Sequence, residues 1–147
     1  MLDASAIVPL FVEQRWSARL EDYLAETRVR PIVSDFATGE TYAALLRLER
    51  IRELSRNATT KAIADFDQWR FEHAEAAECV SGDVRLAAQL VRRADLALRM
   101  PDAIHLAIAR RLAAPLVSFD GRLREAAIAL EIDLAGPSPD DLAGGGE

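Results

Sequence analysis

Apolar residues along the chain alternate between short runs and longer stretches with helical spacing. The short runs are predicted as strands, at residues 1–2, 31–33, 77–80, 116–119 and 132–134. The longer stretches predict helices, over about residues 6–13, 16–26, 36–54, 60–71, 84–94, 101–112 and 122–130. The polar residues 57–60 are interpreted as a break, with Thr60 capping the helix that follows.

This alternation of strands and helices indicates an α/β fold with a mainly parallel central sheet of about five strands, flanked by helices. In such sheets, ligands bind at the carboxyl ends of the strands. The chain has 147 residues, of which 50% are hydrophobic, so we expect one domain with a substantial core, over residues 1–135. Residues 136–147 are rich in Gly, Pro and Asp and lack an apolar period, which predicts a flexible tail.

The formal net charge is −6, which argues against a protein that grips nucleic acid through a large positive field. A phosphate-containing partner would therefore need local positive charge or a metal ion. Cys79 is the only cysteine, so no internal disulfide can form. No run of 18 apolar residues and no signal segment is present. We expect a cytoplasmic protein without membrane association.

Four acidic residues lie where predicted strands end or the next helices begin. Asp3 and Asp120 directly follow strands, Glu40 lies in the opening turns of a helix, and Asp102 begins another. The topology allows all four to face one crevice, where their charges would repel unless a divalent cation compensated. Taken singly, each acid has an ordinary role as a helix cap or turn residue, which stays open.

Polar residues near the same strand ends also have two interpretations. Ser5, Ser34 and Ser118 either cap helices or hydrogen-bond a carboxylate or a metal-bound water. His105, three residues after Asp102, is more simply a packed side chain than a ligand or proton donor. The basic run 47–52 is most often a solvated helix face, and a phosphate-contacting edge is the alternative.

Three segments carry a resemblance to a known family. They are residues 2–6 (LDASA), 101–107 (PDAIHLA) and 118–123 (SFDGRL), and Glu40 in 34–40 (SDFATGE) matches a fourth motif. In this order and spacing, up to about Leu134, the chain resembles the PIN domain, and specifically the VapC toxins of bacterial toxin–antitoxin pairs. The resemblance implies a three-layer parallel-sheet fold, a homodimer, and neutralisation by a VapB-type antitoxin encoded alongside.

The resemblance also implies RNA cleavage by a metal-dependent endoribonuclease. Its acids would bind Mg²⁺, with Mn²⁺ as a possible substitute, and Mg²⁺ prefers oxygen ligands such as these. Asp3 and Asp102 are then the core metal ligands and catalytic residues, and Glu40 and Asp120 complete the site. Ser5 and Ser118 have supporting roles. The number of metal ions and the RNA target stay open.

The chain departs from the family at its beginning, where only Met1 and Leu2 precede the first aspartate, so either the first strand is short or the start lies upstream. A phosphoaspartate hydrolase usually needs a second acid at the position of Ser5, which disfavours that class. A catalytically inactive module that binds RNA or protein through the same fold is the remaining alternative.

Overall fold

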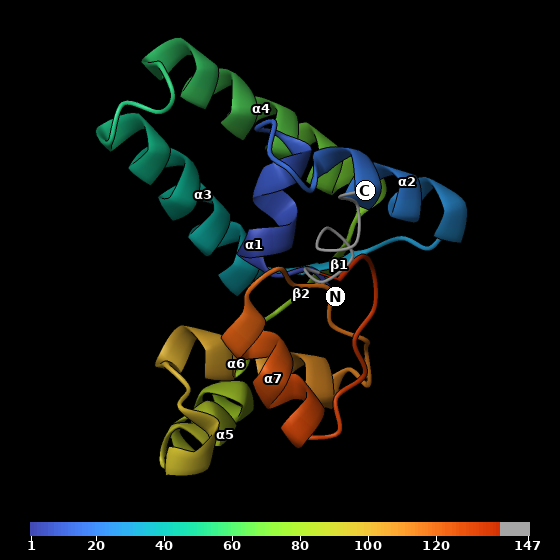
Figure 1. Cartoon of the computed structure of the whole chain (residues 1–147), viewed down its shortest axis with the longest axis vertical. Coiled ribbons are helices and arrows are strands. Elements are labelled where there is room, and N and C mark those ends of the chain that lie inside the picture. The colour runs from blue at the N-terminus through green and yellow to red at the C-terminus, as the bar shows by residue number, and fades with distance from the viewer. Residues whose placement is uncertain (139–147) are drawn as a thin grey trace, which may run out of the picture. The chain divides into compact units, whose positions relative to one another are not determined.

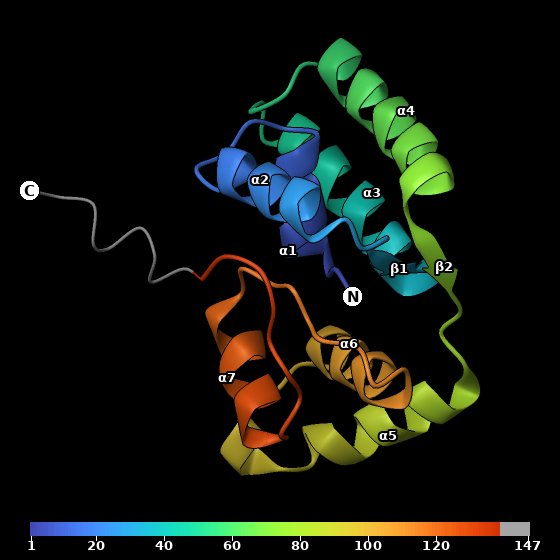
Figure 2. The ribbon, with the colours of Figure 1, turned by 90° about the vertical axis from the view of Figure 1, so that its right-hand side faces the viewer.

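The computed structural model describes residues 1–138 and shows two compact units (Figures 1 and 2). The N-terminal unit is Leu2–Glu78, and the C-terminal unit joins Met1 to the segment from Cys79 onward. Both units contain helices and parallel backbone pairing. The predicted flexible tail lies mostly outside the described residues, which end at 138.

Parallel pairing in the N-terminal unit brings its strands together beside five helical segments. Its elements are α1 (Ala4–Ile7), η1 (Val8–Leu10), α2 (Ser17–Thr27), β1 (Ile32–Ser34), α3 (Asp35–Arg50), α4 (Arg56–His73) and β2 (Glu75–Ala77). β1 pairs in parallel with β2, with Val33 opposite Ala76. Leu2 also forms a parallel bridge to Val33, which places the residue before Asp3 beside the centre of β1.

The core of the N-terminal unit lies between α3 and α4, which run side by side in Figure 2. Phe66 and Leu45 are fully buried there. The ring of Phe66 meets Phe11 edge-on at 5.5 Å and Tyr42 at 5.7 Å, measured between ring centroids. Such edge-to-face pairs favour one packing arrangement. The contact between Tyr42 and Phe66 therefore packs α3, the helix that carries Glu40, against α4.

The C-terminal unit is built around one buried helix. Its elements are α5 (Ser81–Val91), η2 (Ala94–Leu96), α6 (Met100–Arg111) and α7 (Gly121–Ala129). Every residue of α6 from Ala103 to Ala109 is buried, and the alanines among them allow α5 to pack closely. Leu116 forms a parallel bridge to Leu134, and the Val117 N–H donates to the Met1 carbonyl oxygen at 2.8 Å.

An ion pair joins the beginning of α5 to the end of α6. Arg111 donates from Nε to Oδ1 of Asp83 at 2.8 Å and from Nη2 to Oδ2 at 2.9 Å. The Asp83 side chain is only 2% exposed and also accepts the Val80 N–H at 2.9 Å. The burial of this carboxyl acts to raise its pKa, but the Arg111 and Val80 hydrogen bonds outweigh burial and lower the pKa below its ordinary value.

The sheet is shorter than the sequence predicts. Among residues 1–138 only β1 and β2 are strands, whereas the predicted runs near residues 2, 116 and 134 form single bridges. The estimate of about five strands is therefore wrong, although the parallel sense of the pairing is confirmed. β2 also begins two residues earlier than predicted, because the Glu75 N–H already bonds to the Pro31 carbonyl oxygen at 2.9 Å.

The predicted break at residues 57–60 is wrong, because α4 already begins at Arg56. Ser55 is its N-cap, and the Ser55 hydroxyl accepts the Ala58 N–H at 3.2 Å. The preceding helix, α3, ends at Arg50 and not near Leu54, with Arg52 in the left-handed region at φ 64°. None of the helices described in residues 1–138 is long and apolar enough to span a membrane.

Candidate active site

Asp3 is fixed at the start of the first helix. It follows the bridge residue Leu2 and is the N-cap of α1, where its Oδ1 accepts the Ala6 N–H at 2.9 Å. The Ser5 hydroxyl donates to the same carboxylate, lying 2.8 Å from Oδ1 and 3.0 Å from Oδ2. The side chain is 4% exposed. Its backbone cap and the serine together set the orientation of a nearly buried carboxylate.

Glu40 lies further along the same unit, in the second turn of α3, and is half-buried. The helix begins at the end of β1, where the fully buried Ser34 is the N-cap and accepts the Ala37 N–H at 3.0 Å. α1 packs against α3, so Asp3 and Glu40 are carried by two helices in contact.

Asp102 lies in the first turn of α6 and is half-buried. Its Oδ2 accepts the Arg99 N–H at 3.2 Å, which caps the helix. Pro101 precedes it in the first turn, where a proline costs no helical hydrogen bond. His105, one turn further on, is 2% exposed, as a packed histidine is expected to be.

Asp120 is the N-cap of α7, with Oδ1 accepting N–H groups from Arg122 at 2.9 Å and Leu123 at 3.1 Å. Ser118 is fully buried, and its hydroxyl accepts the Asp120 N–H at 3.1 Å. The Arg124 guanidinium donates to the Ser118 carbonyl oxygen at 3.1 Å. Sequence analysis missed this arginine, although its place in the first turn after a strand-end aspartate is a usable signal.

The four acids are divided two and two between the units: Asp3 and Glu40 in the N-terminal unit, Asp102 and Asp120 in the C-terminal unit. Among residues 1–138, no three or more His, Cys, Asp or Glu side chains are grouped as a metal ion would require. The convergence of all four acids therefore stays a prediction. Their chemistry suits a hard cation, because carboxylate oxygens are the ligands that Mg²⁺ prefers.

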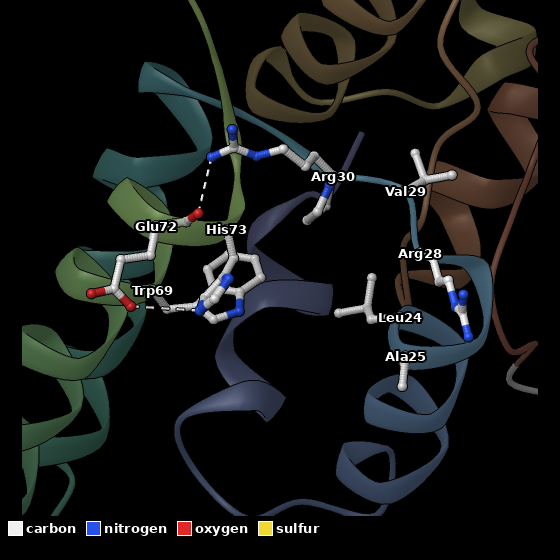
Figure 3. A pocket seen from close by; sticks show the side chains of 9 residues that line it. Leu24, Ala25, Arg28, Val29, Arg30, Trp69, Glu72 and His73 are labelled. Atoms are coloured by element: carbon white, nitrogen blue, oxygen red, sulfur yellow. Dashed lines mark hydrogen bonds and ion pairs between the residues drawn. The ribbon is translucent and has the colours of Figure 1, made fainter.

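A pocket of about 630 Å³ lies elsewhere in the N-terminal unit, between the ends of α2 and α4 (Figure 3). Trp69 and Leu24 line it, and neither Asp3 nor Glu40 does. Arg30 lies at its edge and donates to the backbone oxygen of Glu72 at 3.0 Å, which satisfies a carbonyl at the end of α4. Within the N-terminal unit, this pocket is therefore separate from Asp3 and Glu40.

Known proteins match this chain over nearly its whole length. The PIN domain family model matches residues 1–129. Ribonuclease VapC46 of Mycobacterium tuberculosis is 36% identical over 140 residues, covering 93% of this chain and 96% of that protein. The crystal structure of M. tuberculosis VapC20, described as a sarcin–ricin loop cleaving toxin, superposes with a TM-score of 0.69. It shares 18% identity and covers 92% of this chain and 98% of that one. The first two matches establish that the chain belongs to the PIN domain family, among the VapC proteins, and the third confirms the fold.

Proposed function

We propose that this protein hydrolyses phosphodiester bonds in RNA and is the toxin of a toxin–antitoxin pair. The observation that carries the proposal is the match over 93% of the chain to a relative named a ribonuclease. The four motif acids support it, because three of them cap helices, and two of these, Asp3 and Asp120, come just after residues that form parallel backbone bridges. A protein with a formal charge of −6 needs such a localised site to act on a polyanion.

The proposed site holds Mg²⁺, with Mn²⁺ as a substitute. Asp3 and Asp102 are its core ligands, directly or through water, and Glu40 and Asp120 complete it. The all-oxygen donor set suits Mg²⁺, which uses one or two carboxylates and keeps several waters. When bound, the ion orients a water and stabilises the negative charge that develops on the phosphate.

The remaining residues of the proposed site orient the acids. The Ser5 hydroxyl holds the Asp3 carboxylate, and the Ala6 N–H fixes one of its oxygens. In the C-terminal unit, Ser118 and Arg124 hold the turn that carries Asp120. Preorganised groups of this kind lower the cost of reaching the reactive geometry.

The proposed partners are a second copy of the chain and a VapB-type antitoxin. Both follow from membership among the VapC proteins. A small adjacent reading frame with a DNA-binding start and an amphipathic end would support the antitoxin. Light scattering on the purified protein measures the dimer, and an isolated gene together with a monomer would contradict both partners.

The ribonuclease proposal is tested by comparing wild type with Asp3→Asn and Asp102→Asn on structured RNA, in Mg²⁺, in Mn²⁺ and in EDTA. Asparagine keeps an oxygen that can cap the helix, so the fold is retained while the ligand charge is lost. We expect each variant to cleave at least about 100-fold more slowly, because a metal contributes several kcal/mol to the transition state.

Sequencing of the RNA ends gives the cut site. Equal cleavage in the three proteins would sink the metal ligand assignment. RNA binding without cleavage by folded wild type, with every metal tried, would instead establish the inactive binding module.

A further inference from the structure

We propose that the turn between α3 and α4 is a docking site for the RNA backbone, which we call the basic tip. The basic tip consists of Arg47, Arg50, Arg52 and Arg56. All four side chains are exposed, and no ion pair involving them is found among residues 1–138. The inference rests on the proposed ribonuclease function, because it assigns a second contact for the same RNA.

The charge of the basic tip opposes that of the whole chain. Residues 47–56, which contain the basic tip, also include Glu49 and Glu53, so four arginines and two glutamates leave a formal charge of +2 in a protein whose net charge is −6. Arginine binds phosphate through a planar fork of donors. A local excess of unpaired guanidinium groups is therefore the kind of surface that attracts a phosphate backbone to an acidic protein.

Helix geometry connects the basic tip to the proposed catalytic site. Arg47 follows Glu40 by seven residues on α3, so both lie on nearly the same face, about 10 Å apart along the axis. Ala43 is exposed between them, and nothing lies within 4 Å of a Cβ built on Gly39. A strand bound at Glu40 can therefore continue along α3 over small residues to the arginines.

The helix dipole favours an arginine at only two of the four positions in the basic tip. Arg47 and Arg50 lie in the last turn of α3, where the helix dipole favours cations. Arg56 is the first residue of α4, whose first turn contains no acid, and the dipole disfavours a cation there. Arg52 has φ 64°, a conformation that favours glycine. Neither the helix dipole nor the backbone therefore accounts for an arginine at these two positions.

The competing occupant of this surface is a protein. Leu46 is 43% exposed and Ile51 48% exposed near the arginines, so an apolar contact is available. Two separated aliphatic side chains form only a small apolar area. Exposed apolar residues scattered singly are normal on a protein surface and do not mark an interface. Four unpaired cations favour the polyanion instead.

The two rule-breaking arginines give a sharp test. The variants are Arg52→Gly, Arg56→Gln and the double variant, and Arg28→Gly is the matched control. Arg28 is also an exposed arginine after a helix, with φ 51°, so its replacement makes the same charge and backbone change outside the basic tip. Binding of a labelled single-stranded RNA is measured in EDTA at several salt concentrations, so neither cleavage nor metal contributes.

The slope of log affinity against log salt is negative for a protein that contacts phosphates. We expect each substitution in the basic tip to make this slope less steep by about 0.7, and the double variant by about 1.4. Arg28→Gly leaves that slope unchanged. Both glycine variants raise the melting temperature by about 2–4 °C, since each removes a left-handed arginine. Weaker RNA binding by a more stable protein cannot come from unfolding.

Several results would overturn the docking site. The first is that wild type binds no RNA. The second is that a basic-tip variant has the same salt slope as wild type, and the third is that Arg28→Gly makes the salt slope less steep by the same amount. A changed oligomeric state with unchanged RNA affinity would assign the surface to a protein partner and overturn it as well. Failure of RNA cleavage alone would sink the ribonuclease proposal and leave these binding results standing.

Discussion

Replacing Arg111 by methionine breaks the ion pair that joins α5 to α6. The Asp83 side chain is 2% exposed and that of Arg111 is 36% exposed. Removing one partner of a buried pair costs about 3–5 kcal/mol, because the other charge stays buried. Solvent reaches Arg111, so we discount the loss in unfolding free energy to about 2–3 kcal/mol. For a chain of this size, that loss lowers the melting temperature by about 5–10 °C.

The effect should depend on pH with a defined sign. Because the Asp83 pKa is lowered in the folded wild type, the pair stabilises the protein above the unfolded pKa of about 3.9 and is lost as pH falls through the folded value. In Arg111→Met, the burial of Asp83 is opposed only by the Val80 hydrogen bond, so the pKa of Asp83 rises and protonation relieves the cost at mildly acidic pH. The stability difference between wild type and variant therefore narrows toward pH 3.

Urea unfolding followed by circular dichroism, at pH 7 and at pH 3 to 4, measures both effects. Asp83→Asn with Arg111→Met completes a double-mutant cycle, since asparagine still accepts the Val80 N–H without a buried charge. The double variant should be more stable than Arg111→Met alone. A loss below about 0.5 kcal/mol at pH 7, or one that is equally large at pH 3, would refute the reasoning.

Two further substitutions test other contacts. Ser55→Ala removes the N-cap of α4 and should lower the unfolding free energy by about 1 kcal/mol in urea, and an unchanged midpoint would contradict the capping role. Ser5→Ala removes the hydroxyl that donates to Asp3 and should raise the Mg²⁺ concentration for half-maximal RNA cleavage by about tenfold. Unchanged Mg²⁺ dependence would remove Ser5 from the proposed site.

Helices with a clear apolar stripe were predictable from sequence. Residues 16–26 were predicted and α2 is Ser17–Thr27, with Leu20 fully buried. The start of α4 was not predictable from polarity alone. Its first two turns are polar, yet Thr59 and Thr60 donate to backbone oxygens of Ser55 and Arg56, so these side chains hydrogen-bond along the helix instead of ending it. The absence of Gly and Pro there was the better signal.

The prediction of the strands was wrong for a different physical reason. An apolar run such as residues 116–119 marks buried backbone, but a strand also needs a neighbour in register over several residues. Here Leu116 pairs with Leu134 over a single bridge. The number of bridges depends on how far two distant segments run together, which no local pattern specifies. The same limit explains why the sequence placed each acid near the beginning of a helix but could not establish whether the four acids lie close together in space.

Capping and metal binding could not be separated from sequence because both place an aspartate at the beginning of a helix. The structure makes the overlap explicit, since Asp3, Asp102 and Asp120 each accept a backbone N–H there. The two roles nevertheless need different properties of the side chain. A cap needs one oxygen, which asparagine keeps, whereas a ligand to Mg²⁺ needs the negative charge, which asparagine lacks. At Asp3, alanine should therefore lower stability and abolish cleavage, while asparagine should abolish cleavage alone.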